Sequence, residues 1–162
     1  MLLLRYAAVV ALAVWVGGLL VLGAIAAPAV FDVTAARHLP DSRLVAGALF
    51  GEMLRRFTLL SYGAGTVLLL SLLARRILGP RPKRFGWRVA LVALMLAATA
   101  YGGIVVASRI AELQRAIGVA PSTLAESDPR RAEFGRLHAL STALQLVPLL
   151  GGAALMFWEI KE

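Results

Sequence analysis

The sequence predicts an all-α fold: an integral membrane four-helix bundle that forms one domain over residues 1–162. Hydrophobic residues make up 60% of the chain and the mean hydropathy is +0.81, whereas a soluble domain is nearer half apolar. The charged residues gather in clusters and leave four uncharged stretches, at residues 6–31, 57–74, 89–108 and 137–158. A hydrocarbon core about 30 Å thick requires roughly 20 helical residues, so each stretch can cross it once.

The first stretch also has features of a secretory signal peptide: an early Arg5, an apolar run and the small-residue segment AIAA. The apolar region of a signal peptide is usually about 7–15 residues long, and this stretch is longer. It also contains Trp15 and three glycines, which suit helix packing. We therefore expect it to be retained as the first membrane helix.

The second helix is predicted to begin before the lipid, with Asp41 or Ser42 as its N-cap. Glu52 and Arg56 are spaced i, i+4 and can form an ion pair. Gly47 and Gly51 form a GxxxG motif that allows another helix to approach closely.

The third helix is predicted to continue past the membrane and to stop near Gly118. Ser127 or Asp128 is the expected N-cap of the fourth helix, with Pro129 in its first turn. Helices two to four are thus expected to extend beyond the bilayer on the outer side.

The segment 75–88 contains six basic residues and no acid, which is the densest basic cluster in the chain. The positive-inside rule places this segment in the cytoplasm, and four spans then place both termini there. We expect a multi-pass protein of the bacterial inner membrane, with the lipid bilayer as its first partner. The basic segment 75–88 is expected to attract anionic lipids, at about 1 kcal/mol per residue near the surface.

The sequence pI of 11.3 would also suit a nucleic-acid-binding protein. The basic residues flank membrane spans, however, and no nucleic-acid-binding motif accompanies them. We therefore expect no nucleic-acid partner. The chain has no cysteine, which excludes disulfides and thiolate metal sites.

A polar stripe runs along the fourth helix. At 100° per residue, one sector collects His138, Ser141, Gln145, Pro148 and Gly152. Polar groups are costly in lipid, so this stripe is expected to face the bundle interior. The other helices offer similar faces: Trp15 and Gly18 on the first, Glu52, Arg56, Gly63 and Thr66 on the second, and Tyr101, Ser108, Glu112 and Arg115 on the third.

Two interpretations of these stripes remain open: ordinary packing and hydrogen-bonding contacts between helices, or a binding pocket for a small molecule, a metal or a porphyrin. The candidate ligand-binding residues are His138, Ser141, Gln145, Glu52, Arg56, Tyr101, Ser108, Arg109, Glu112 and Trp15. We expect His138 to form a cluster with the charged outer ends of helices two and three, since antiparallel neighbours place matched depths side by side.

The inventory of ligands limits metal and haem chemistry. The chain has two histidines, His38 and His138, both predicted on the outer side. A zinc or copper site needs three or four ligands, which His138 reaches only by adding carboxylates such as Glu52 or Glu112, or Met53 for copper. A hydrolase has no better support, because no nucleophile elbow accompanies Ser141.

Four segments carry a resemblance to a known family: RYAAVVALAVWVGGLLVLGAIAAPAVF, LRRFTLLSY, SRIAELQRAIG and FGRLHALSTALQL. The chain resembles the transmembrane protein 205-like family, through the W-x-G-G stretch at Trp15 and the F-x-x-L-H-x-x-S motif at 134–141. The family is similar in outline to copper-resistance D type and haem-linked four-helix membrane proteins. Those groups carry a histidine before the tryptophan of helix 1, and this chain has none there. The resemblance therefore implies the fold and marks His138, and it implies no reaction.

Three functional hypotheses follow. The first is a binding or transport-associated protein with an outer-facing polar pocket around His138. The second is a haem-, porphyrin- or copper-handling membrane oxidoreductase. The third is a structural subunit of a membrane complex or a homo-oligomer, in which the stripes only provide packing contacts between helices.

Overall fold

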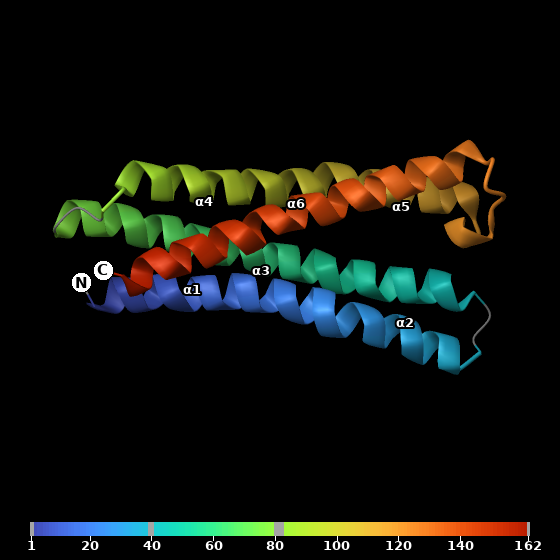
Figure 1. Cartoon of the computed structure of the whole chain (residues 1–162), viewed down its shortest axis with the longest axis horizontal. Coiled ribbons are helices and arrows are strands. Elements are labelled where there is room, and N and C mark those ends of the chain that lie inside the picture. The colour runs from blue at the N-terminus through green and yellow to red at the C-terminus, as the bar shows by residue number, and fades with distance from the viewer. Residues whose placement is uncertain (1, 39–40, 80–82, 162) are drawn as a thin grey trace.

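The computed structural model describes residues 2–38, 41–79 and 83–161, and it is an all-α four-helix bundle (Figure 1). The first rod consists of α1 (Leu2–Val21), the π-helical turn η1 (Leu22–Ala26) and α2 (Ala27–Ala36). The second rod is α3 (Ser42–Leu78). The third rod consists of α4 (Phe85–Ala100), the π-helical segment η2 (Tyr101–Val106) and α5 (Ala107–Ile117). The fourth rod is α6 (Pro129–Ile160), which follows the short 3₁₀ turn η3 (Pro121–Thr123).

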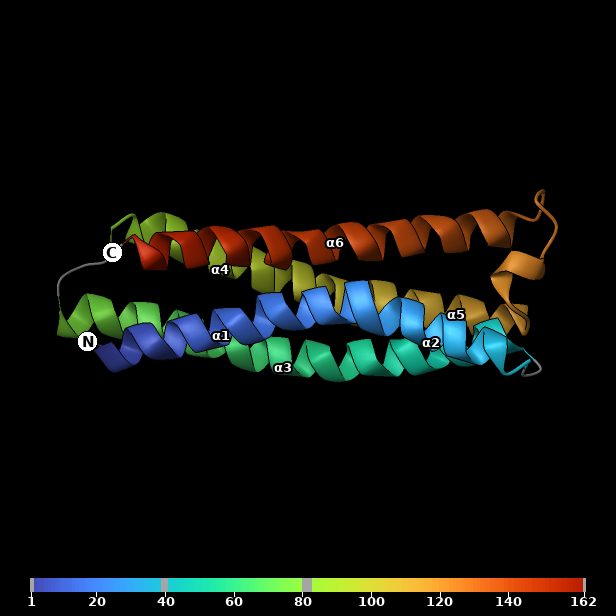
Figure 2. The same ribbon diagram turned by 60° about the horizontal axis from the view of Figure 1, so that its bottom comes forward.

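Each rod is long and apolar enough to cross a membrane, and together they contain all four predicted spans. Both ends of the chain lie at one end of the bundle, together with the α3–α4 connection (Figures 1 and 2). We call this the termini end. The α2–α3 and α5–α6 connections lie at the opposite end, which we call the loop end.

The predicted helix boundaries at the loop end are confirmed. Helix α3 begins at Ser42 after Asp41, although the Asp41 side chain makes no capping hydrogen bond. Gly118 ends α5 with φ +72°, a left-handed conformation that glycine adopts without steric cost. The Asp128 side chain caps α6 by accepting a hydrogen bond from the backbone N–H of Arg130, and Pro129 occupies the first turn.

The hydrophobic core lies toward the termini end. Helices α1 and α4 each contact both α3 and α6, so the four helices form a closed ring. Their buried side chains include Leu12, Trp15, Leu72, Met95 and Leu155. The first rod therefore supplies part of the core.

The loop end is packed more loosely. No residue of α5 is buried, and the buried residues of α6 all lie between Pro148 and Glu159. Polar side chains hold the connections together: Arg43 Nη1 donates to Ser122 Oγ at 2.7 Å, and Arg131 Nη1 donates to the Leu124 carbonyl at 2.9 Å. The two ends of the bundle thus differ in how tightly they are closed.

Candidate functional site

The candidate site residues other than Trp15 lie on α3, the third rod and α6, and most of them are exposed, whereas Trp15 is buried in the core. On α3, Glu52 forms the expected ion pair with Arg56, at 2.8 Å, and also pairs with Arg55, at 2.6 Å. The Arg56 side chain is 76% exposed. Gly63 and Thr66, on the same predicted face, are exposed as well. The expectation that this face of the second helix turns inward is therefore wrong.

The third rod shows a similar difference. Tyr101, Ser108, Glu112 and Arg115 are all exposed, so the predicted interior stripe of this helix is also wrong. The physical reason is the loose packing of the loop end: Ser108, Glu112 and Arg115 lie on α5, and no residue of α5 is buried.

His138 is exposed near the start of α6, and its ring stacks on Phe134 with the centroids 6.1 Å apart. Within the residues that the structure describes, no hydrogen bond or ion pair joins the His138 side chain to Glu52, Ser108 or Arg109. The same holds for Arg56 and Glu112. Among the described residues, the structure thus shows no polar bond between His138 and the charged ends of α3 and α5.

The remainder of the α6 stripe turns gradually into the bundle. Ser141 and Gln145 are half-buried, and Pro148 and Gly152 are buried. The inward direction predicted for the fourth helix therefore holds from its middle toward the termini end.

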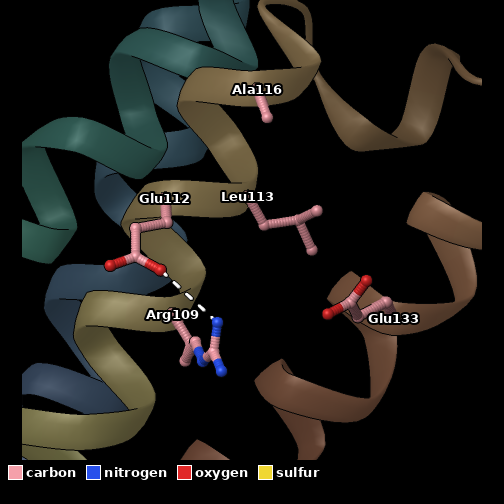
Figure 3. Close-up of a pocket in the computed structure, with 5 residues that line it drawn as sticks. All are labelled: Arg109, Glu112, Leu113, Ala116 and Glu133. Atoms are coloured by element: carbon pink, nitrogen blue, oxygen red, sulfur yellow. Dashed lines mark ion pairs between the residues drawn. The ribbon is translucent and has the colours of Figure 1, made fainter.

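One pocket forms between α5 and α6, with a cavity volume of ≈ 210 Å³. Arg109, Glu112, Leu113 and Ala116 line it from α5, and Glu133 faces them from α6 (Figure 3). Arg109 Nη1 lies 3.7 Å from Glu112 Oε2. Two residues predicted as ligand contacts, Arg109 and Glu112, therefore share a pocket with Glu133, which was not among the predicted contacts.

Among the described residues, a group of buried charged side chains lies at the termini end, and it was not predicted from the sequence. Glu159 of α6 accepts hydrogen bonds from Arg75 Nη1 of α3, at 2.8 and 2.9 Å, and from Arg88 Nη1 of α4, at 2.5 Å. The three side chains are 3–7% exposed. Arg5 of α1 donates from Nη2 to the Glu159 backbone carbonyl at 2.7 Å. We call Arg5, Arg75, Arg88 and Glu159 the ionic cluster.

The ionic cluster had a recognisable signal in the sequence. Each of its four members is the charged residue next to one uncharged stretch, at the end of that stretch that lies at the termini end of the bundle. From the sequence, Arg75 and Arg88 were predicted to face anionic lipids, and Glu159 marked only the end of the fourth uncharged stretch. Charges at matched ends of four spans in an antiparallel bundle meet at one depth, so they could have been paired with one another.

The cluster also defines the depth of the bundle. From its members to the first charge at the loop end, the uncharged stretches contain 18 to 26 residues. At 1.5 Å per residue a stretch of 20 residues spans about 30 Å, the thickness of a hydrocarbon core. Charged side chains thus mark both edges of the region that the four uncharged stretches form, which we call the apolar slab.

The described side chains offer no metal site with three ligands. Among them, no group of three or more His, Asp or Glu residues gathers in a metal-binding arrangement. His38 and His138 are both exposed.

Comparison with known proteins places the chain in a family without assigning an activity. No curated protein and no solved structure matches the chain. A family model matches residues 10–118, from the middle of α1 to the end of α5, which is more than half of the chain. The protein is therefore a four-helix, multi-pass membrane protein that belongs to the family described as domain of unknown function DUF4149.

Proposed function

We propose that this protein is a membrane binding protein, associated with transport, that holds a small organic cation in the pocket between α5 and α6. The observation that carries this proposal is the pair of carboxylates, Glu112 and Glu133, which line one ≈ 210 Å³ cavity from two helices. Arg109 offsets one of these charges, so the three groups carry a formal charge of −1. A ligand with one positive group would neutralise the pocket.

The other lining residues define the rest of the ligand. Leu113 and Ala116 offer a short apolar surface beside the carboxylates. This combination suits an amine with a small aliphatic part, because apolar contact adds to the charge-assisted hydrogen bonds. A longer molecule would extend along α6 toward His138 and Ser141, which stay candidate contacts.

The proposal can be tested with a matched pair of probes on the detergent-purified protein. Titration with n-butylammonium is expected to bind saturably in ligand-observed NMR, and n-butyrate, of similar size and opposite charge, is expected not to bind. Glu133→Gln should weaken n-butylammonium binding, whereas Glu126→Gln, at a 93% exposed acid outside the pocket, should not. Equal binding of both probes, or an equal effect of both variants, would argue against a cation site.

The direction in which the pocket faces follows from the proposed topology. If segment 75–88 lies in the cytoplasm, the pocket opens on the outer side of a bacterial inner membrane. A solute-binding site on that side fits a transport-associated role.

The termini end is proposed to bind anionic lipids. Arg76, Lys83 and Arg84 are exposed there, and Arg76 also lies over the Phe85 ring at 4.9 Å. Arg75 and Arg88 are instead buried in the ionic cluster, so this role falls to the exposed members of the segment. Arg81 lies outside the described residues.

A second candidate function, that of a subunit in a membrane complex or homo-oligomer, is favoured by one feature of α3. Val45, Leu49 and Met53 recur every four residues and are 39%, 51% and 38% exposed. They precede Arg55 and Arg56, so they lie on the part of the helix expected beyond the bilayer. Chemical crosslinking from a cysteine at Leu49 would test this candidate. A crosslinked product would support it, and the absence of one in intact membranes would contradict it.

We also propose that the chain is related to the transmembrane protein 205-like family, which the motif at 134–141 supports.

A further inference from the structure

Three polar side-chain atoms are buried in the middle of the bundle with no hydrogen-bond partner in the described part of the chain. They are Trp15 Nε1 of α1, Tyr62 Oη of α3 and Thr99 Oγ1 of α4. Buried polar groups are nearly always paired, and within a bilayer water is not freely available to compensate. Three unpaired atoms in one region therefore require an explanation.

Contacts between the helices place these residues together. A Cβ atom at Gly65 would lie 2.5 Å from Leu96 Cδ2 and 2.9 Å from Trp15 Cζ3, so the indole ring reaches the α3–α4 interface. Tyr62 is one turn from Gly65 on α3, and Thr99 is one turn from Leu96 on α4. We call Trp15, Tyr62 and Thr99 the polar layer.

A second contact confirms the register of α3 against the third rod. A Cβ atom at Gly103 would lie 2.9 Å from Thr58 Cγ2 and 3.6 Å from Tyr62 Oη. Two helices that pair Gly65 with Leu96 and Thr58 with Gly103 also place Tyr62 opposite Thr99. The three polar residues thus come from three helices, and each lies about one helical turn from the Gly65–Leu96 contact or, for Trp15, packs its ring against it.

The polar layer lies near the middle of the apolar slab. Its members are roughly 10 to 13 residues from the ionic cluster, or roughly 15–20 Å along the helices. They all fall within the uncharged stretches, which contain no Asp, Glu, Lys or Arg. An ion bound at this depth would have no counter-charge beside it, so the layer suits an uncharged ligand.

The backbone is irregular beside the polar layer. The π-helical segment η2 begins two residues after Thr99, and π-helical turns are frequent at functional sites. On α6, Pro148 has no N–H to donate to the Leu144 carbonyl, and Leu144 Cδ1 approaches Gly102 of η2, where a Cβ atom would be 3.6 Å away. The regular helical hydrogen bonding is therefore interrupted on two neighbouring helices at this depth.

We propose that the polar layer binds an uncharged molecule through an oxygen atom held by Trp15 Nε1, Tyr62 Oη and Thr99 Oγ1. The indole N–H can only donate, whereas the two hydroxyls can donate or accept. The ligand must therefore offer an acceptor, which an uncharged oxygen provides through its lone pairs. A water molecule from the aqueous phase and a carbonyl oxygen of a lipophilic molecule from the bilayer share this chemistry.

The experiment uses the Trp15 indole as its reporter. The chain has three tryptophans, so the Trp87→Phe/Trp158→Phe protein retains Trp15 alone. The ¹⁵N-labelled protein is prepared in lipid nanodiscs, and the indole N–H resonance is recorded with its cross-relaxation to water. The proposal predicts a downfield, hydrogen-bonded indole proton. It also predicts that the indole proton moves upfield in Tyr62→Phe or Thr99→Val. The indole proton should stay unchanged in the controls Tyr6→Phe and Thr66→Val, whose side chains are exposed.

The remaining outcomes identify the source of the oxygen or overturn the proposal. Cross-relaxation to water would identify water. A downfield resonance without it, lost on exhaustive delipidation and restored by membrane lipid extract, would identify a lipophilic carbonyl. An upfield indole resonance that no variant shifts would overturn the proposal. A downfield resonance that shows no cross-relaxation to water and survives delipidation would also overturn it, because such a resonance indicates a direct hydrogen bond within the protein.

Discussion

Arg75 Nη1 of α3 lies 2.8 Å from Glu159 Oε1 of α6, across 84 residues of sequence, and the two side chains are 7% and 3% exposed. The same carboxylate also accepts from Arg88 of α4. One acid therefore ties three helices together at the termini end. Because a buried charge is costly without its partner, this contact is expected to matter more for stability than the exposed ion pairs at the loop end.

The first prediction concerns the removal of that acid. Glu159→Gln leaves the buried guanidinium groups of Arg75 and Arg88 without the carboxylate, which costs about 3–5 kcal/mol when one member of a buried pair is removed. Glu133→Gln, at an exposed acid of the same helix, should change stability by less than about 0.5 kcal/mol. Thermal unfolding in detergent measures both, and equal melting temperatures would show that the ionic cluster does not hold the bundle.

The second prediction compares two glycines on α3. Gly65→Ala would place a methyl group 2.5 Å from Leu96 Cδ2 and 2.9 Å from Trp15 Cζ3, so these side chains must shift. Such overpacking costs about 1–3 kcal/mol. No side chain lies within 4 Å of the corresponding position at Gly63, so Gly63→Ala should be neutral or stabilising by up to about 1 kcal/mol. If both variants melt at the same temperature, Trp15 does not pack against α3 as described.

The sequence predicted the fold well because membrane spans are recognised by the absence of charge, and several helix ends carry their own local signals. Asp128, Pro129 and Gly118 act through local backbone chemistry, which depends on few neighbours. The side-chain faces were harder to predict. Most of the stripe predicted for the third helix lies on α5, where no residue is buried, and a count of polar positions does not reveal how loosely that end of the bundle packs.

The candidate site shows the same limit. Arg109 and Glu112 were predicted as ligand contacts and do line a pocket, yet their partner Glu133 comes from another helix, whose rotation a sequence stripe does not define. Glu159 was overlooked because a charge at the end of a span is usually solvated. Its burial depends on three arginines that meet it from other helices.

The third prediction is topological. The chain has no cysteine, so a single introduced thiol is the only target for a maleimide. Lys83 and Ala125 are exposed at opposite ends of the bundle. With the basic segment in the cytoplasm, Ala125→Cys should react with a membrane-impermeant maleimide on intact cells, and Lys83→Cys should react only after the cells are opened. The reverse labelling pattern would place the termini outside and the proposed cation pocket in the cytoplasm.

The last prediction concerns the start of α6 and its dependence on pH. The Arg130 side chain, and secondly the Arg130 backbone N–H, donate to the Asp128 carboxylate and hold its pKa below the ordinary value. Because the pKa of Asp128 is lower in the folded state than in the unfolded state, the unfolded chain binds a proton at Asp128 first as the pH falls. The stabilisation is therefore fully present above the ordinary Asp pKa of about 3.9, and it is lost as the pH falls through the lower pKa of the folded state.

Asp128→Ala should accordingly melt at a lower temperature than the parent protein at pH 7, and the difference should shrink as the pH is lowered below about 4. Asp128→Asn keeps a side-chain acceptor for the Arg130 N–H but has no charge, so its melting temperature should lie between the other two at pH 7 and should lack this pH dependence. Circular dichroism melts of the three proteins between pH 3 and pH 7 provide the measurement. A parent-minus-alanine difference that stays constant over this range would mean that the capping carboxylate acts through its shape and not through its charge.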